Sequence, residues 1–562
     1  MNKLSKVSLT MVVVLALFAG LVWSNRADVM LAIIEFAVPR MNPVGPNVAV
    51  EWSSGADSEG RDAADLPPNI VLILADDLGW NDLTFAGGGV AGGTVPTPNI
   101  DSLAADGVNF VNAYAANATC APSRAALMSG RYGTRFGFEF TPVPPGMSTM
   151  LRMMRSQSAA PLRPTIRNEG GESPGTMLDL GMPASEITLA ELLSGQGYHT
   201  VHIGKWHLGQ AEGMTPVAQG FDESLLMDIG LYLPKDHPDV VNAKQAFDPI
   251  DRFLWSALQF AVSFSGGEAF EPARYLTDYY TDEAVKVIEA NKDRPFFLYL
   301  AHWAPHTPLQ ATKEDYDALS HIELHRERVY AAMIRALDRG VGQVLDALKD
   351  NGLEENTLVI FTSDNGAASY IGLPEVNAPY RGWKMTLFEG GIRVPYLIRW
   401  PAVIPAGTTV SQPAHHFDLF ATAAAAGGAA LPGDRKIDGI NLLPFVKGEA
   451  NSEAGVVTHE GLFWRSGASQ AALVDGWKLN VSRPRGGQSN KWLFDLRADP
   501  TERVDLSETR PEKLAELEAA LEAHNAEQAS SMWPSTASTG INIDKDLSIP
   551  DALDDEYVYW TN

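Results

Sequence analysis

The chain has 562 residues, of which 45% are hydrophobic and 20% charged, a composition that supports a large buried core. It carries 43 basic and 69 acidic residues, a formal net charge of -26 at pH 7, which argues against a nucleic-acid partner. Cys120 is the single cysteine, so an intramolecular disulfide is excluded.

The N-terminus resembles an export segment. Lys3 and Lys6 precede an apolar run from Val7 to Val22, which is the pattern of a signal peptide or an uncleaved signal anchor. We therefore expect residues 1–28 to direct the chain to the periplasm or the exterior, with membrane anchoring left open, because a span needs roughly 20 apolar residues. Residues 29–68 are predicted to be a linker, since most of them are rich in Pro, Gly, Ser and Asp without periodicity.

Residues 69–431 are predicted to form an α/β domain. Continuous apolar runs begin at Asn69, His199, Pro295 and Thr357, and they alternate with stretches of helical periodicity. Such runs are typical of strands buried on both faces. The pattern indicates a large mixed, mostly parallel sheet covered by helices, with polar residues at the carboxyl ends of the strands, where ligands bind in such sheets.

Four further regions depart from this alternation. Residues 141–182 and 231–273 are insertions, which could form a substrate-pocket wall, a membrane-contacting flap or simply extra helices and loops. Residues 432–541 are predicted to form a smaller C-terminal α+β domain with a small sheet and one helix. Residues 542–562 are predicted to be a solvated acidic tail.

The most specific motif surrounds Cys120. The segment Cys120-Ala-Pro-Ser-Arg124 opens a helical stretch, and backbone N–H groups at a helix N-terminus favour an anion. Together with the Ser-Gly-Arg-Tyr that follows, it resembles the signature that directs oxidation of cysteine to formylglycine in the sulfatase family. The resemblance implies a maturation enzyme as partner and an aldehyde hydrate at Cys120 as nucleophile. The alternative is a structural cysteine beside an accidental match.

Paired carboxylates indicate a metal site. Asp76 and Asp77 end one apolar run, and Asp364 and Asn365 end another. Adjacent buried carboxylates are costly unless a cation neutralises them, and an oxygen-only ligand set suits a hard ion such as Ca²⁺. Taken singly, each pair could be a turn or a helix cap. Both motifs resemble the sulfatase metal site, which implies one Ca²⁺ bound by these four residues and by the modified side chain of Cys120.

Cationic and proton-transferring residues lie after the apolar runs that begin at His199 and Pro295, and further along the chain. They are Lys205, His207, His306 and Lys384. The resemblance implies that Arg124 and Lys205 hold the nucleophile and the sulfate, that His207 assists turnover, and that His306 and Lys384 contact the sulfate or the leaving group. The alternative for each lysine is a solvated surface charge.

Three other patterns are set aside. The glycine-rich run from Gly87 to Gly92 satisfies a dinucleotide-binding pattern but leads into no helix. His302 and His306 have the spacing of a zinc pair, but Pro305 places them on a loop. The segment from Thr97 to Phe110 is predicted to contain a capped helix without a catalytic role.

The resemblance to sulfatases of the alkaline phosphatase superfamily covers about residues 69–431, and LFDLRADPTERVDL resembles their C-terminal part. It implies hydrolysis of a sulfate ester on a sulfated carbohydrate or aryl compound. Two alternatives stay open. The first is a phosphonate or phosphate ester hydrolase of the same superfamily, and the second is a non-catalytic binder that retains the fold.

Overall fold

The computed structural model describes residues 23–55, 66–157, 162, 164–166, 175–447, 458–484, 486–552 and 554–562. The apolar run Val7–Val22, on which the predicted export segment rests, lies outside these residues. Within the described ranges, the structure contains no helix that combines the length and the apolar character needed to span a bilayer.

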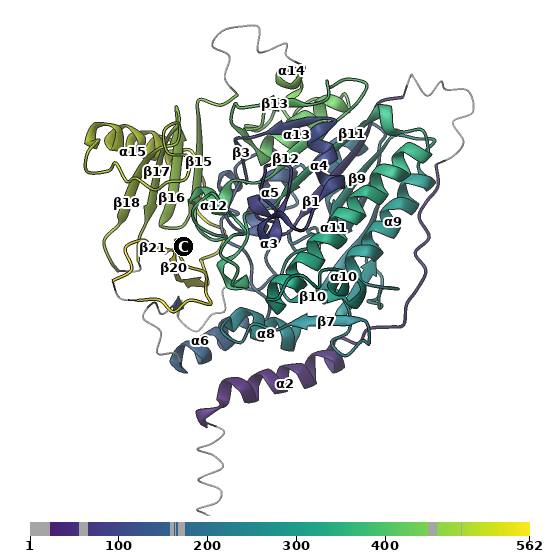
Figure 1. Cartoon of the computed structure of the whole chain (residues 1–562). Coiled ribbons are helices and arrows are strands. Elements are labelled where there is room, and N and C mark those ends of the chain that lie inside the picture. Colours follow the sequence, from purple (N-terminus) through teal and green to yellow (C-terminus); the bar gives the residue numbers. More distant parts are fainter. Residues whose placement is uncertain are drawn as a thin grey trace, which may run out of the picture.

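A nine-stranded mixed sheet forms the centre of the molecule (Figure 1). Its order is β13 (Thr408–Val410), β2 (Val108–Phe110), β12 (Tyr396–Arg399), β11 (Thr357–Ser363), β1 (Asn69–Ala75), β9 (Phe296–Ala301), β5 (His199–Gly204), β6 (Glu223–Gly230) and β8 (Phe260–Phe264). The five strands from β11 to β6 are parallel to one another, whereas β12 and β8 pair antiparallel. The predicted α/β class with a mixed, mostly parallel sheet is confirmed.

Helices cover both faces of the sheet. Val71 and Ile73 of β1 pack in one apolar cluster with α9 (Leu276–Ala290) and α11 (His325–Asp350). Alternate residues of the same strand, including Ile70 and Leu72, pack in a second cluster with α5 (Cys120–Ser129), α7 (Leu189–Ser194) and α13 (His416–Ala426). Side chains alternate across a strand, and helices cover both faces of the sheet. Every residue of β1 is therefore buried.

The parallel arrangement brings polar side chains to one edge of the sheet. Asp76 directly follows β1, Lys205 follows β5 and Asp364 follows β11. These three strands and β9 run in the same direction, so their carboxyl ends lie together. The candidate site is at this edge.

The C-terminal domain is a four-stranded antiparallel sheet with one helix, as predicted. The strands are β15 (Gly461–Ser466), β16 (Ser469–Val474), β17 (Trp477–Ser482) and β18 (Asn490–Asp495), and α15 (Pro511–Ala526) packs on them. The last residues differ from the predicted solvated tail. β21 (Val558–Trp560) pairs with β20 (Gly540–Asn542), and Tyr559 is fully buried beside Phe388. The tail is held in place because Tyr559 packs against Phe388 of the catalytic domain and Tyr557 stacks on Trp492 of the C-terminal domain.

The segment predicted as a linker is partly structured. Residues 29–68 begin inside the helix α2 (Arg26–Met41), and Trp52 further along donates its indole N–H to Glu283 at 2.8 Å. α2 packs on two helices of the insertions, α6 (Met147–Gln157) and α8 (Pro249–Ala257), as Figure 1 shows. This packing joins segments far apart in sequence, which composition does not reveal. The second insertion also contributes β7 (Val240–Ala243) and the edge strand β8.

Candidate active site

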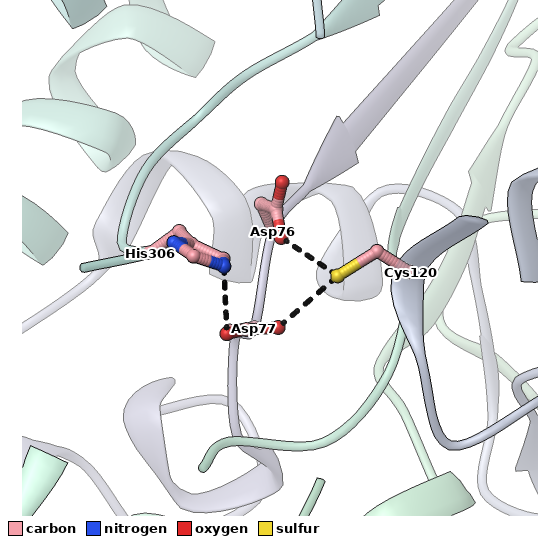
Figure 2. A group of neighbouring side chains, drawn as sticks. All are labelled: Asp76, Asp77, Cys120 and His306. Atoms are coloured by element: carbon pink, nitrogen blue, oxygen red, sulfur yellow. Dashed lines mark hydrogen bonds and ion pairs between the residues drawn. The ribbon is translucent and has the colours of Figure 1, made fainter. Parts of the chain in front are cut away.

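Cys120 is the first residue of α5 and is 3% exposed. Its Sγ lies 3.5 Å from Oδ1 of Asp76 and 3.7 Å from Oδ1 of Asp77. Figure 2 shows the thiol and His306 on either side of the two carboxylates, which come from the turn after β1. Residues from separate parts of the chain therefore meet around the cysteine.

The surroundings of Cys120 disfavour its thiolate. Burial, and then the charge of Asp364, raise the pKa of the Cys120 thiol well above its ordinary value. Lys205 and Lys384 act in the opposite direction but do not cancel this effect. The unmodified side chain is thus a protonated thiol at neutral pH, which is a poor nucleophile.

Arg124, one helical turn after Cys120, joins two of the predicted metal-binding carboxylates. Its guanidinium donates to Oδ2 of Asp76 and to Oδ2 of Asp364, both at 3.0 Å, and to the carbonyl of Lys205 at 2.8 Å. None of the three charged side chains is exposed. Helix α5 therefore supplies both the cysteine and the cation that fixes its acidic neighbours.

The two predicted lysines also reach this cluster and are buried, which excludes the alternative of solvated surface charges. Nζ of Lys205 lies 2.5 Å from Asp76, and Nζ of Lys384 lies 2.6 Å from Oδ1 of Asp77 and 3.1 Å from Sγ of Cys120. Burial acts to lower the pKa of Lys384, but the charge of Asp77 together with Cys120, Tyr370 and Asp76 outweighs burial and raises this pKa well above its usual value. Lys384 is thus a fixed cation beside the cysteine.

Asn365 and Asp77 show how a cation fits. Nδ2 of Asn365 donates to Oδ1 of Asp77 at 2.7 Å, while its buried Oδ1 has no hydrogen-bond partner. A buried amide oxygen without a partner is costly unless a ligand satisfies it. With Asp76, Asp77 and Asp364 close by, this oxygen completes the donor set that hard divalent cations prefer. The residues present therefore fit a metal ion such as Ca²⁺.

Charge within the cluster is balanced by the protein itself. Burial and the charge of Asp364 raise the pKa of Asp76 to about 7, although Lys205 and Arg124 oppose this. Burial also acts to raise the pKa of Asp77, but Lys384, His306 and Lys205 together outweigh burial and hold that pKa well below its usual range. The cluster contains three acidic side chains and three basic ones. A bound divalent cation would therefore give the site a net positive charge, which an anionic substrate would neutralise.

Two histidines flank the cluster. Nε2 of His306 lies 3.5 Å from Oδ2 of Asp77, and its Nδ1 donates to the Thr307 carbonyl at 2.5 Å. His306 also belongs to a group with Asp76, Asp77 and Cys120 whose ligand atoms lie within 4.8 Å of one another. Burial lowers the pKa of His306 to about 3, so its ring is neutral.

His207 lies on the loop after β5, where its φ of 62° is left-handed. Its Nδ1 is buried without a hydrogen-bond partner, and burial followed by the charge of Lys205 lowers its pKa well below the usual value. A neutral ring with one free nitrogen can accept a proton. Within the described part of the chain, no hydrogen bond or ion pair joins His207 directly to Cys120.

The patterns set aside from the sequence form no second site. His302 faces Tyr280, with ring centroids 6.5 Å apart, and among the described residues the group of possible metal ligands that contains His306 does not include His302. The glycine-rich run leads into a distorted turn with left-handed Ala91 and Gly92. The predicted helix after Thr97 is present as α4 (Pro98–Ala105).

Sequence reasoning missed three aromatic residues of the site. Tyr370 donates its hydroxyl to Oδ2 of Asp77 at 3.0 Å, and the Tyr299 hydroxyl lies 3.5 Å from Arg124. Trp303 stacks on His306 with ring centroids 3.9 Å apart, and Nζ of Lys205 lies 4.6 Å from its ring centroid. Trp303 lies at the end of a strand beside His302, a position that could have indicated it, whereas nothing local marks Tyr370.

Comparison with known proteins is consistent with this geometry. A family model described as Sulfatase matches residues 68–429. N-acetylgalactosamine-6-sulfatase of Homo sapiens is 33% identical over 489 residues, covering 80% of this chain and 83% of that protein. Steryl-sulfatase of Mus musculus is 32% identical over 564 residues, covering 84% of each. The crystal structure of Ps i-CgsB in complex with k-i-k-neocarrahexaose is similar with a TM-score of 0.65 and 31% identity, covering 83% of this chain and 94% of that chain.

Proposed function

The chain belongs to the sulfatase family and is a sulfuric ester hydrolase, and from this premise we propose that it acts through a formylglycine formed from Cys120. The observation that carries the proposal is the position of Cys120. Its Sγ is at the head of α5, 3.1 Å from a buried lysine and within 3.7 Å of two carboxylates. A protonated thiol is a poor nucleophile there, whereas a hydroxyl of an aldehyde hydrate, placed among fixed cations, is well suited to attack sulfur.

The chain's own residues divide the remaining tasks. Arg124 and Lys205 hold the acidic groups and present positive charge to the sulfate, and Lys384 stabilises the oxygen at position 120 as it loses its proton. His306, held by Thr307, faces the departing ester oxygen with Lys384. His207 takes the proton when the second hydroxyl of the hydrate expels the sulfate.

One calcium ion is part of the proposal. Asp76, Asp77, Asp364 and Asn365 would hold it, together with an oxygen of the modified Cys120 side chain. When bound, the ion supplies positive charge to the sulfate oxygens during transfer. The unpartnered Oδ1 of Asn365 supports this assignment.

For the substrate we propose a sulfated carbohydrate. One similar protein is named an N-acetylgalactosamine-6-sulfatase, and a similar structure was solved with a neocarrahexaose. A steryl-sulfatase is similar to this chain at comparable sequence identity, so a non-sugar or aryl sulfate is the second candidate substrate. The chain is further proposed to be exported, to the periplasm or the exterior, and to be matured by a formylglycine-generating enzyme, because the modification requires one.

Mass spectrometry with paired substrates tests the proposal. The peptide containing Cys120 should lose the mass that separates a thiol from an aldehyde after co-expression with a formylglycine-generating enzyme. The matured enzyme should cleave sulfated sugars in preference to phosphate and phosphonate esters of the same alcohols. An unmodified Cys120 with no ester cleaved would favour a non-catalytic binder, and preferred cleavage of the phosphorus esters would favour the superfamily alternative.

A further inference from the structure

Helix α2 is apolar on two opposite faces. One face, with Ala27 and Leu31, is buried against α6 and α8. The other face carries Val29, Ile33 and Phe36, which are exposed to 36%, 53% and 63%. A helix on the surface of a soluble domain normally presents polar residues to water, so the exposed stripe is unusual.

The way α2 is attached makes the stripe a fixed feature of the folded protein. Asp28 of α2 forms an ion pair with Arg252 of α8, and Glu35 pairs with Lys235 at 2.8 Å. These two pairs lie to one side of the helix and set its rotation on the insertions. Figure 1 shows α2 at the outer edge of the molecule, beyond α6 and α8. The stripe is thereby turned away from the protein.

The ends of the stripe are cationic and aromatic. Arg40 lies over the ring of Phe36 at 3.6 Å, and Arg26 lies over Trp23 at 5.0 Å. Trp23 and Met41 extend the apolar surface past both ends of the helix, with exposures of 71% and 76%. Tryptophan and arginine beside an apolar stripe are typical of helices that lie in a membrane interface, because their polar ends reach the headgroups.

We propose that α2 lies flat in the interface of a lipid bilayer, with the stripe of Val29, Ile33 and Phe36 inserted between the headgroups. The helix has 16 residues, too few for a span. The apolar run Val7–Val22 ends directly before Trp23, so a bilayer that held this run would begin where α2 begins. The net charge of -26 favours a bilayer of neutral lipids over an anionic one.

A second copy of the chain fits the stripe less well. Antiparallel pairing of two α2 helices would bring Arg26 of one copy close to Arg40 of the other, and like charges at that spacing are unfavourable. A bilayer creates no such conflict.

Docking by α2 would also orient the catalytic domain. α2 rests on the insertion 231–273, and Tyr232 of that insertion donates its hydroxyl to the carbonyls of Trp303 and His306 at 2.8 and 2.9 Å. The insertion on which α2 rests therefore also contacts the loop that carries His306.

Fluorescent labelling of the full-length chain tests the proposal. In a Cys120→Ala background, a single environment-sensitive label is placed by Ile33→Cys, by Phe36→Cys, by Glu35→Cys or by Val504→Cys. Val504 is the matched control, since it is 57% exposed on a remote surface. Phosphatidylcholine vesicles are then added, and a parallel series uses phosphatidylglycerol vesicles.

We expect the emission at positions 33 and 36 to shift to the blue with phosphatidylcholine and to be quenched by lipid-borne quenchers. Position 35 should respond less, position 504 should not respond, and phosphatidylglycerol should give a smaller effect. Equal responses at positions 33 and 504 would overturn the proposal, even if the vesicles bind the chain through its first 22 residues. A blue shift without vesicles that grows with protein concentration would overturn it as well, because it would assign the stripe to a second copy.

Discussion

The guanidinium of Arg124 lies 3.0 Å from the carboxylate of Asp76, and neither side chain has any exposed surface. The same guanidinium binds Asp364, from a different strand. One residue of α5 thus joins the ends of β1 and β11 at the point where the site forms. Removal of one partner from a buried ion pair is strongly unfavourable, because the other charge stays buried without compensation.

Arg124→Ala should therefore destabilise the fold as well as abolish turnover. We expect a loss of roughly 3–5 kcal/mol in the free energy of unfolding, measured by urea denaturation followed by circular dichroism. Arg124→Lys keeps the charge but cannot bind both carboxylates, so its loss should be smaller. Equal stability of Arg124→Ala and wild type would show that the pairs contribute nothing.

Lys384 and Tyr370 both bind Asp77, but only Lys384 also reaches Cys120. Lys384→Met should lower kcat by roughly 10²–10³, as expected when a donor to a developing negative charge is lost. Tyr370→Phe removes one hydrogen bond to Asp77 and should cost far less. Steady-state kinetics on one sulfate ester compares them, and similar losses in both variants would mean that Lys384 acts only through Asp77.

Calcium should stabilise the folded chain through Asn365 and its acidic neighbours. A ligand that binds the native state at about 100 times its Kd adds about 2.7 kcal/mol, so Ca²⁺ should raise Tm and a chelator should reverse the rise. Asn365→Ala should reduce the shift in Tm, because the substitution removes Oδ1, one of the proposed ligands of the ion. Asp346→Asn, an exposed carboxylate on α11, is the matched control. If both variants respond to Ca²⁺ as wild type does, the ion binds elsewhere.

The sequence predicts those parts of the site that depend on local pattern. Asp76, Lys205 and Asp364 end apolar runs, and parallel strands bring such ends together. Tyr370 could not be predicted in this way, since it reaches Asp77 from the short 3₁₀ helix Ser369–Ile371, which follows no apolar run and whose position depends on packing. The same holds for Tyr559, buried by a pairing near the end of the chain.

Asp82 should make stability depend on pH. Burial raises the pKa of Asp82 to about 8, although Tyr330 and the amide of Gly79 donate to its Oδ2 at 2.6 Å each. Because the folded-state pKa lies above the unfolded value, the contribution of Asp82 is fully present below about pH 4 and is lost as the pH rises towards 8. Asp82→Asn should remove this slope. Tm values at pH 5 and pH 8 give the comparison, and parallel changes in both proteins would mean that Asp82 is ionised throughout.

Lys478 links the C-terminal domain to the loop that carries Lys384. Its Nζ lies 2.7 Å from Glu389 and 3.0 Å from Glu502, and all three side chains are fully buried. Glu389 begins the short helix α12 (Glu389–Ile392), five residues after Lys384. The buried cation therefore fixes the start of α12 against the C-terminal sheet.

Lys478→Met keeps the side-chain volume but leaves Glu389 and Glu502 without their shared cation, so it should lower the free energy of unfolding by roughly 3–5 kcal/mol. Lys491→Met is the matched control, because Lys491 of β18 forms a solvent-exposed pair with Glu518 of α15, and an exposed ion pair contributes about 0–1 kcal/mol. Since the start of α12 would also loosen, kcat should fall in Lys478→Met and stay unchanged in Lys491→Met. A Lys478→Met enzyme with wild-type stability and kcat would show that this buried charge neither holds the domains together nor positions Lys384.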